Sequence, residues 1–135
     1  MLDDRLTGDE RRALLLLLTS VALADGKLSD SEVRFVRRLA APVGTEVGEL
    51  LGAVDGVTED ELCARLERPV AARIAVVELL RLAHVDDVYA HVEERVIHRL
   101  ATRLAVDEER LHELESWVRR EWQLQAEGRR LVEER

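Results

Sequence analysis

The apolar residues of this chain recur with a helical period along almost its whole length. Leucine, alanine, arginine and glutamate dominate, and apolar and polar residues do not alternate as they do in a strand. Proline, glycine and capping residues divide the pattern into segments. The pattern predicts about seven helices, at residues 9–24, 29–41, 46–54, 59–68, 69–85 and 89–104, with a last helix that begins after Asp107.

Three of these helices begin with the sequence of a capping box. A serine or threonine is followed three residues later by glutamate, so that hydroxyl and carboxylate satisfy the free backbone amides of the first turn. The pairs are Thr7 with Glu10, Ser29 with Glu32, and Thr58 with Glu61.

Two of the segments are apolar nearly all round. One contains Leu14 to Leu18, and the other contains Ile74, Val76, Val77, Leu79, Leu80 and Leu82. A helix without a polar face is surrounded by other helices. Cys63 lies beside Leu62 and Leu66 and is interpreted as a small buried apolar residue. We therefore expect an all-α bundle formed by a single domain over residues 1–135, with its core at about 8–120 and a charged helical tail at 121–135.

The two tryptophans lie on the last helix. Trp117 continues the apolar spacing of Leu111, Leu114 and Val118, which predicts that it is part of the core. Trp122 and Leu124 lie where that spacing weakens, so they are interpreted either as packing on the bundle or as a surface for a partner or a homodimer.

Part of the sequence repeats after 61 residues. Segment 14–47 aligns with 75–108 without a gap, and each segment reads as an apolar helix, an acidic turn and an amphipathic helix. The repeat predicts two helical hairpins related by a pseudo-twofold axis.

Each turn has aspartate followed seven positions later by glutamate: Ala24-Asp25-Gly26-Lys27-Leu28-Ser29-Asp30-Ser31-Glu32, and then Val85-Asp86-Asp87-Val88-Tyr89-Ala90-His91-Val92-Glu93. This pattern over residues 10–118 resembles the TerB-like family, named after tellurite-resistance proteins, and is similar to the N-terminal domain of DjlA-type membrane-anchored co-chaperones. The second turn departs from the family pattern, because Asp87 replaces glycine and no Ser or Thr cap is present. The resemblance implies an all-helical fold with two related halves, acidic residues proposed as a metal site, no enzymatic activity, and a role in tellurite or stress response beside membrane-associated complexes.

The four repeated acids, Asp25, Glu32, Asp86 and Glu93, would converge if the pseudo-twofold axis is real. Two like charges about 6 Å apart repel by ~3 kcal/mol at an effective dielectric constant near 20. Such a cluster needs a cation, basic partners or raised pKa values. Oxygen ligands favour Ca²⁺, Mg²⁺ or Mn²⁺ over zinc.

Other interpretations of these acids stay open. Arg34, Arg38, Arg95 and Arg99 also repeat and would neutralise the acids without a metal. Glu32 fits a capping box, and Asp25-Gly26 fits a turn that ends a helix. A standard EF-hand is excluded, because Val21 and Leu23 occupy two of its ligand positions.

A second metal hypothesis uses a histidine face. His91, Glu94 and His98 share one side of a helix and could bind Zn²⁺, Fe or Ni²⁺. Their spacing fits neither the Glu-x-x-His pairs of di-iron bundles nor His-Glu-x-x-His, so a solvated polar face is the plainer interpretation.

Composition narrows the classes of function. The 135 residues carry a net charge of −8, which disfavours nucleic-acid binding. The longest apolar run is too short to span a membrane, no signal peptide is recognisable, and the single cysteine excludes an internal disulfide, so we expect a cytoplasmic location. No catalytic triad or phosphate-binding glycine loop is recognisable. We expect a non-enzymatic protein that binds a divalent cation or scaffolds a complex, with pure protein–protein interaction as the alternative.

Overall fold

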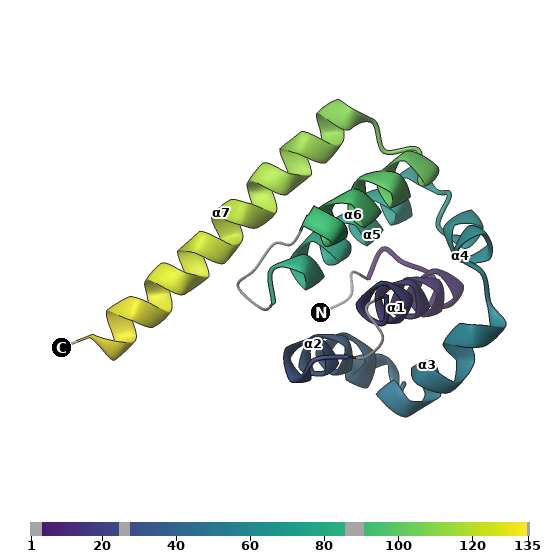
Figure 1. Ribbon diagram of the computed structural model, residues 1–135, viewed down its shortest axis with the longest axis horizontal. Helices are drawn as coiled ribbons and strands as arrows, with labels where there is room; N and C mark the ends of the chain where they lie inside the picture. Colours follow the sequence, from purple (N-terminus) through teal and green to yellow (C-terminus); the bar gives the residue numbers. More distant parts are fainter. Residues whose placement is uncertain (1–3, 25–27, 86–90, 135) are drawn as a thin grey trace.

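The computed structural model describes residues 4–24, 28–85 and 91–134, and within them every regular element is helical (Figure 1). The α-helices are α1 Gly8–Ala22, α2 Asp30–Ala40, α3 Val47–Ala53, α4 Glu59–Arg65, α5 Pro69–Ala83, α6 His91–Arg103 and α7 Glu108–Glu133. Two 3₁₀ turns, Ala41–Val43 and Val54–Gly56, lie on either side of α3. The predicted all-α fold is confirmed.

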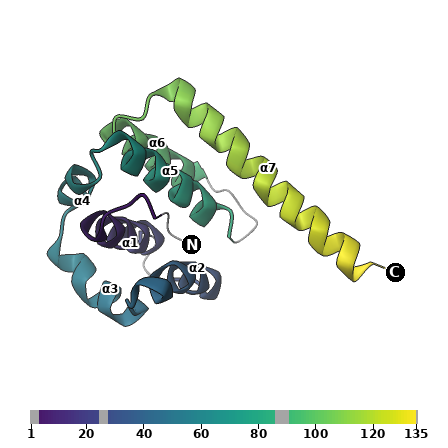
Figure 2. The same ribbon diagram turned by 180° about the vertical axis from the view of Figure 1, so that it is seen from behind.

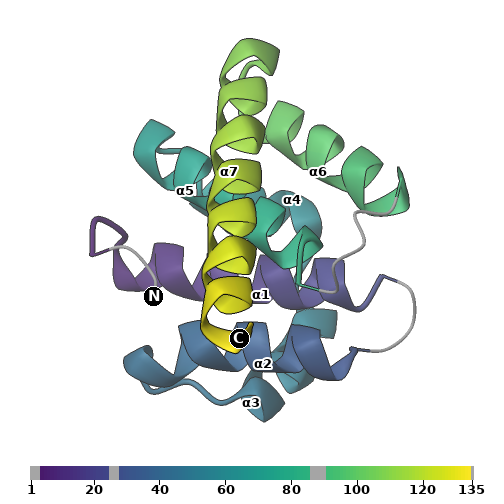
Figure 3. The same cartoon turned by 90° about the vertical axis from the view of Figure 1, so that its left-hand side faces the viewer.

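The core is built around α1. Leu14, Leu15, Leu16, Leu17 and Leu18 are each at most 1% exposed, because α2, α3, α4 and α5 all contact this helix. Figure 3 shows α1 crossing the middle of the molecule. The second apolar helix, α5, contacts α1, α6 and α7. Both helices are therefore central, as their sequences predict, and Cys63 is buried as expected.

The 61-residue repeat is present in the helix boundaries. α1 and α5 have 15 residues each and begin 61 positions apart, at Gly8 and Pro69. α2 and α6 begin at Asp30 and His91, again 61 positions apart. α1 contacts α2, and α5 contacts α6. The sequence repeat thus corresponds to two helical hairpins of the same register.

Local sequence accounts for most helix ends. All three predicted capping boxes form, at Thr7, Ser29 and Thr58. α4 ends at Arg65, three residues before the predicted end. Arg68 precedes Pro69 and has an extended backbone (φ −62°, ψ 129°), because the proline ring disfavours a helical conformation in the preceding residue.

α7 is one continuous helix of 26 residues, which runs along one side of the bundle and projects past it (Figures 1 and 2). Its buried side chains are Leu111 and Val118. The prediction that Trp117 belongs to the core is wrong: its side chain is 44% exposed, and the Arg81 guanidinium lies 5.4 Å from the ring centroid. None of the described helices is long and apolar enough to cross a bilayer.

Candidate functional site

The structure describes one of the four predicted acidic side chains. Asp25 and Asp86 lie outside the described residues, and the side chain of Glu93 does as well. Glu32 is buried at the start of α2, where its Oε1 accepts a hydrogen bond from Ser29 N at 2.8 Å. Glu32 N in turn donates to Ser29 Oγ at 3.1 Å. The observed role of Glu32 is therefore that of a helix cap.

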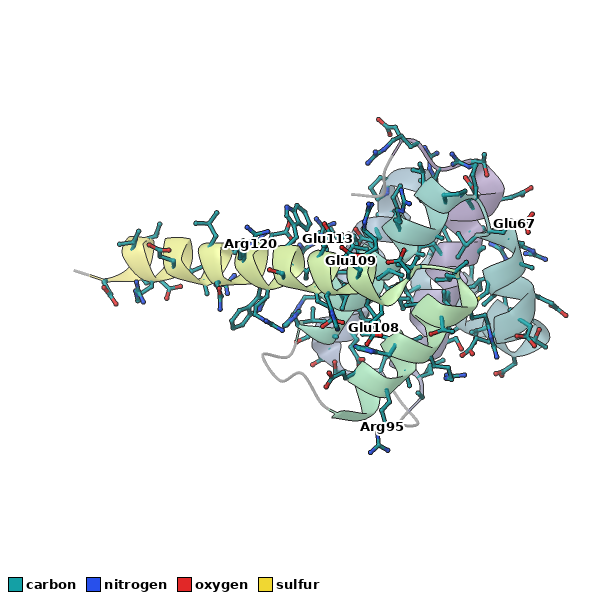
Figure 4. All side chains as sticks on the ribbon, turned by 90° about the horizontal axis from the view of Figure 1, so that it is seen from above. Glu67, Arg95, Glu108, Glu109, Glu113 and Arg120 are labelled. Carbon is teal, nitrogen blue, oxygen red and sulfur yellow. The ribbon has the colours of Figure 1, made fainter. Side chains whose placement is uncertain are left out.

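The repeated arginines have varied surroundings. Arg99 donates to both carboxylate oxygens of Glu59 on α4, at 2.6 and 3.2 Å. Arg34 donates to Ser31 Oγ within α2, and Arg95 is exposed and points away from the bundle (Figure 4). Among the described side chains, these arginines do not form a common group around Glu32.

The structure describes only part of the histidine face. The side chain of His91 lies outside the described residues, whereas His98 Nε2 lies 2.9 Å from Glu115 Oε1 and joins α6 to α7. No group of three potential metal ligands occurs among the described residues. In this part of the chain, His98 therefore serves as a contact between helices.

A cleft of about 590 Å³ opens where α2, α5 and α7 meet. Both hairpins contribute to it, because α2 belongs to the first and α5 to the second, while α7 provides the remaining wall. Its lining comprises Phe35, Arg38, Leu39, Glu78, Arg81, His84, Val85, Val118, Glu121, Trp122, Gln125 and Arg129.

A charged network occupies the boundary between α5 and α7. Arg81 Nη1 donates to Glu78 Oε1 at 2.5 Å, and its Nε and Nη2 each donate to a carboxylate oxygen of Glu121 at 2.9 Å. Glu78 is 3% exposed, and this burial raises the pKa of its carboxyl group although Arg81 opposes the change. Sequence reasoning missed this network. The available signal was Glu78, the one acid of a mostly apolar helix, three residues before Arg81.

Two aromatic rings form another part of the lining. The His84 and Trp122 ring centroids are 6.0 Å apart, with a tilt of 32°. Burial, together with the positive charge of Arg119, lowers the pKa of His84, so its imidazole is neutral at pH 7. Trp122 therefore packs partly on the bundle, and it is Trp117 that is exposed.

The remaining charges of the lining are the guanidinium groups of Arg38 and Arg129. Within the described part of the chain, neither forms an ion pair, whereas Arg81 is held by two carboxylates. The cleft thus combines two cationic groups on α2 and α7 with an apolar and aromatic surface. Such a surface is suited to binding a carboxylate-bearing group that has an apolar neighbour.

Comparison with known proteins identifies one family. Residues 1–54, which include α1, α2 and α3, match the family model described as Tellurite resistance protein TerB. The resemblance inferred from the two acidic turns over residues 10–118 is confirmed for the segment that contains the first turn. No curated protein and no solved structure matches the chain.

Proposed function

Residues 1–54 are TerB-like, and from this premise we propose that the protein is a non-enzymatic binding module of a tellurite-resistance or stress-response system. It acts in the cytoplasm as a scaffold, and it holds a segment of a protein partner in the cleft between α2, α5 and α7. The partner can belong to a membrane-associated complex, as the TerB resemblance implies.

The observation that carries the proposal is the charge of the cleft. Arg38 and Arg129 contribute two positive charges that no described acid neutralises, although the chain as a whole has a net charge of −8. Guanidinium groups form strong paired hydrogen bonds with carboxylates. The occupant that fits is an acidic segment with an apolar side chain, which would pack against Trp122.

The position of Glu32 also favours this function over a metal site. Its carboxylate accepts a backbone hydrogen bond at the start of α2, which is the structural role expected in a pure interaction domain. Glu32 therefore has a structural role that needs no cation.

The test measures peptide binding by the fluorescence emission of Trp122, which lines the cleft. In a Trp117→Phe variant, Trp122 is the single tryptophan of the sequence. We expect a synthetic peptide of alternating glutamate and leucine to change its emission in a saturable way, whereas a lysine–leucine peptide should not. Arg38→Gln should weaken binding of the acidic peptide at least fivefold. Arg37→Gln is the matched control, since Arg37 is exposed on the same helix and does not line the cleft.

Three results would contradict the proposal. The first is the absence of any response to the acidic peptide, and the second is an equal response to both peptides. An equal loss of affinity in Arg37→Gln and Arg38→Gln would also contradict it, because it would indicate general charge attraction.

A second candidate function is cation binding by Asp25, Glu32, Asp86 and Glu93. The observation that supports it is the shared register of the hairpins. Glu32 and Glu93 are each the third residue of their helices, and Asp25 and Asp86 each follow the preceding helix by three positions. The ligand types would favour Ca²⁺, Mg²⁺ or Mn²⁺.

Thermal unfolding of the metal-stripped protein tests this candidate. Saturation with one of these cations at about a hundredfold over Kd should add ~2.7 kcal/mol of stability. The Asp25→Asn/Asp86→Asn variant should lose this effect. No shift with any cation, or an equal shift in both proteins, would exclude the four-acid site.

A further inference from the structure

Three exposed apolar side chains follow one line along α7. Trp117, Leu124 and Leu131 are 44%, 69% and 67% exposed. They are seven residues apart, which is close to two helical turns, so they lie on one face with a drift of only about 20° per step. We call these three residues the α7 stripe.

The stripe continues onto a part of α7 that lies beyond the bundle. Figure 4 shows this C-terminal half standing away from the other helices. Between residues 123 and 134, every described side chain except that of Ala126 is exposed. A helix segment of this length is only marginally stable in water by itself. Packing of its apolar side chains against another protein surface would stabilise this segment.

The stripe is complementary to itself. Trp117 and Leu131 are placed symmetrically about Leu124, seven residues to either side. If two copies of α7 cross in opposite directions at Leu124, each Trp117 meets Leu131 of the second copy, and the two Leu124 side chains meet each other. A twofold axis at Leu124 therefore pairs all six apolar side chains, as a closed dimer interface requires.

The charges beside the stripe select the antiparallel direction. Arg120 and Glu127 lie on the same side of the stripe, four residues before Leu124 and three after it. In the antiparallel pair, Arg120 comes within one residue rise, about 1.5 Å along the axis, of Glu127 of the second copy. In a parallel pair the twofold axis runs along the helices, so the Arg120 and Glu127 side chains of the two copies lie on opposite sides of the stripe and form no such contact.

We propose that the protein forms an antiparallel homodimer through the α7 stripe. The interface lies on another side of α7 than Arg129, which follows Leu124 by five residues and so lies about 140° around the helix from it, and it adjoins the cleft only where Arg81 lies over Trp117. The dimer would present two clefts, one on each copy. The proposed dimer therefore does not depend on the peptide-binding proposal.

The experiment is sedimentation equilibrium of the full chain over a range of concentrations. The chain mass is 15.3 kDa, and we expect a concentration-dependent species of twice that mass. Leu124→Glu should weaken dimerisation at least tenfold. Gln123→Glu, an exposed neighbour on another face with the same added charge, should leave it unchanged. Circular dichroism of both variants checks that α7 remains helical.

A charge exchange tests the direction of the helices. Arg120→Glu alone and Glu127→Arg alone should each weaken the dimer, because each creates a like-charge contact across the interface. The double variant Arg120→Glu/Glu127→Arg should restore it. A monomer at every concentration, a larger assembly, or a dimer that tolerates Leu124→Glu would overturn the proposal. A double variant that is weaker than both single variants would overturn the antiparallel arrangement.

Discussion

The Glu121 carboxylate and the Arg81 guanidinium form a paired contact, with both nitrogen–oxygen distances at 2.9 Å. The contact joins the middle of α7 to α5 at the edge of the cleft. Arg81 also binds Glu78, and its guanidinium lies over Trp117. One arginine thus connects a buried acid, a surface acid and an exposed aromatic ring. This connection is one of the contacts between α7 and the bundle, beside the buried Leu111 and Val118 and the contact of Glu115 with His98.

Removing the Glu121 carboxylate should loosen α7. Glu121→Ala leaves Arg81 with a single acidic partner, and a hydrogen-bonded charged contact that is about a third exposed contributes less than the sum of two buried ones, each worth about 1.5–3 kcal/mol. We expect urea unfolding to show a loss of about 2 kcal/mol. Glu133→Ala, on the exposed end of the same helix, should change stability by less than about 0.5 kcal/mol. Similar losses in the two variants would show that the paired contact is unimportant.

Stability should fall in acid because of Glu10. Hydrogen bonds from Arg68, with a further one from the Thr7 backbone, lower the pKa of this buried carboxyl group to about 2 from its usual 4.5. The unfolded chain therefore takes up this proton first, and the stabilisation present above pH 4.5 is lost as the pH falls toward 2.

Urea unfolding between pH 6 and pH 2 measures the contribution of Glu10. Glu10→Gln should flatten the pH dependence, since the amide does not titrate. Glu61→Gln alters a capping box on α4 that is exposed and not paired with Arg68, and it should keep the wild-type slope. A slope unchanged by Glu10→Gln would rule out this assignment.

His84 should make stability depend on pH in a higher range. Burial and Arg119 lower its pKa below the usual 6.5, so the unfolded chain gains this proton before the folded chain does. Its contribution is complete above pH 6.5 and decreases as the pH falls through the lowered value. In the Trp117→Phe protein, Trp122 emission should report the titration with a midpoint below 6.5, because the two rings are in contact. His84→Gln should abolish the transition, and a midpoint at or above 6.5 would contradict the argument.

Shortening a buried leucine of α1 should strongly lower the stability of the protein. Leu17 is 0% exposed, and Leu17→Ala should cost about 2–5 kcal/mol, which combines lost burial with the cavity left behind. Leu51→Ala removes the same atoms from a side chain that is 39% exposed on α3, and its cost should be much smaller. Chemical unfolding of both variants makes the comparison, and equal costs would show that α1 is not the centre of the core.

Helix starts and central helices could be predicted because their causes are local. A capping box needs only a hydroxyl and a glutamate three residues apart, and Thr7, Ser29 and Thr58 all provide one. The apolar surroundings of α1 follow from its run of five leucines. The prediction for Trp117 failed because the apolar period shows on which side of the helix a side chain lies. It does not show how much of that side a neighbouring helix covers. Val118 is 1% exposed, whereas Trp117 is 44% exposed and lies beneath the Arg81 guanidinium.

The sequence by itself determined the helical fold, the two hairpins and the TerB-like character of the first segment, because period, capping and repeat are properties of short stretches. Only the tertiary structure decided which groups meet. Glu78 and Arg81 lie on α5, Glu121 lies on α7 40 positions after Arg81, and their contact depends on how α7 lies against α5. The cleft likewise requires α2, α5 and α7 together. Contacts between distant residues depend on the packing of whole helices, and no local pattern specifies it.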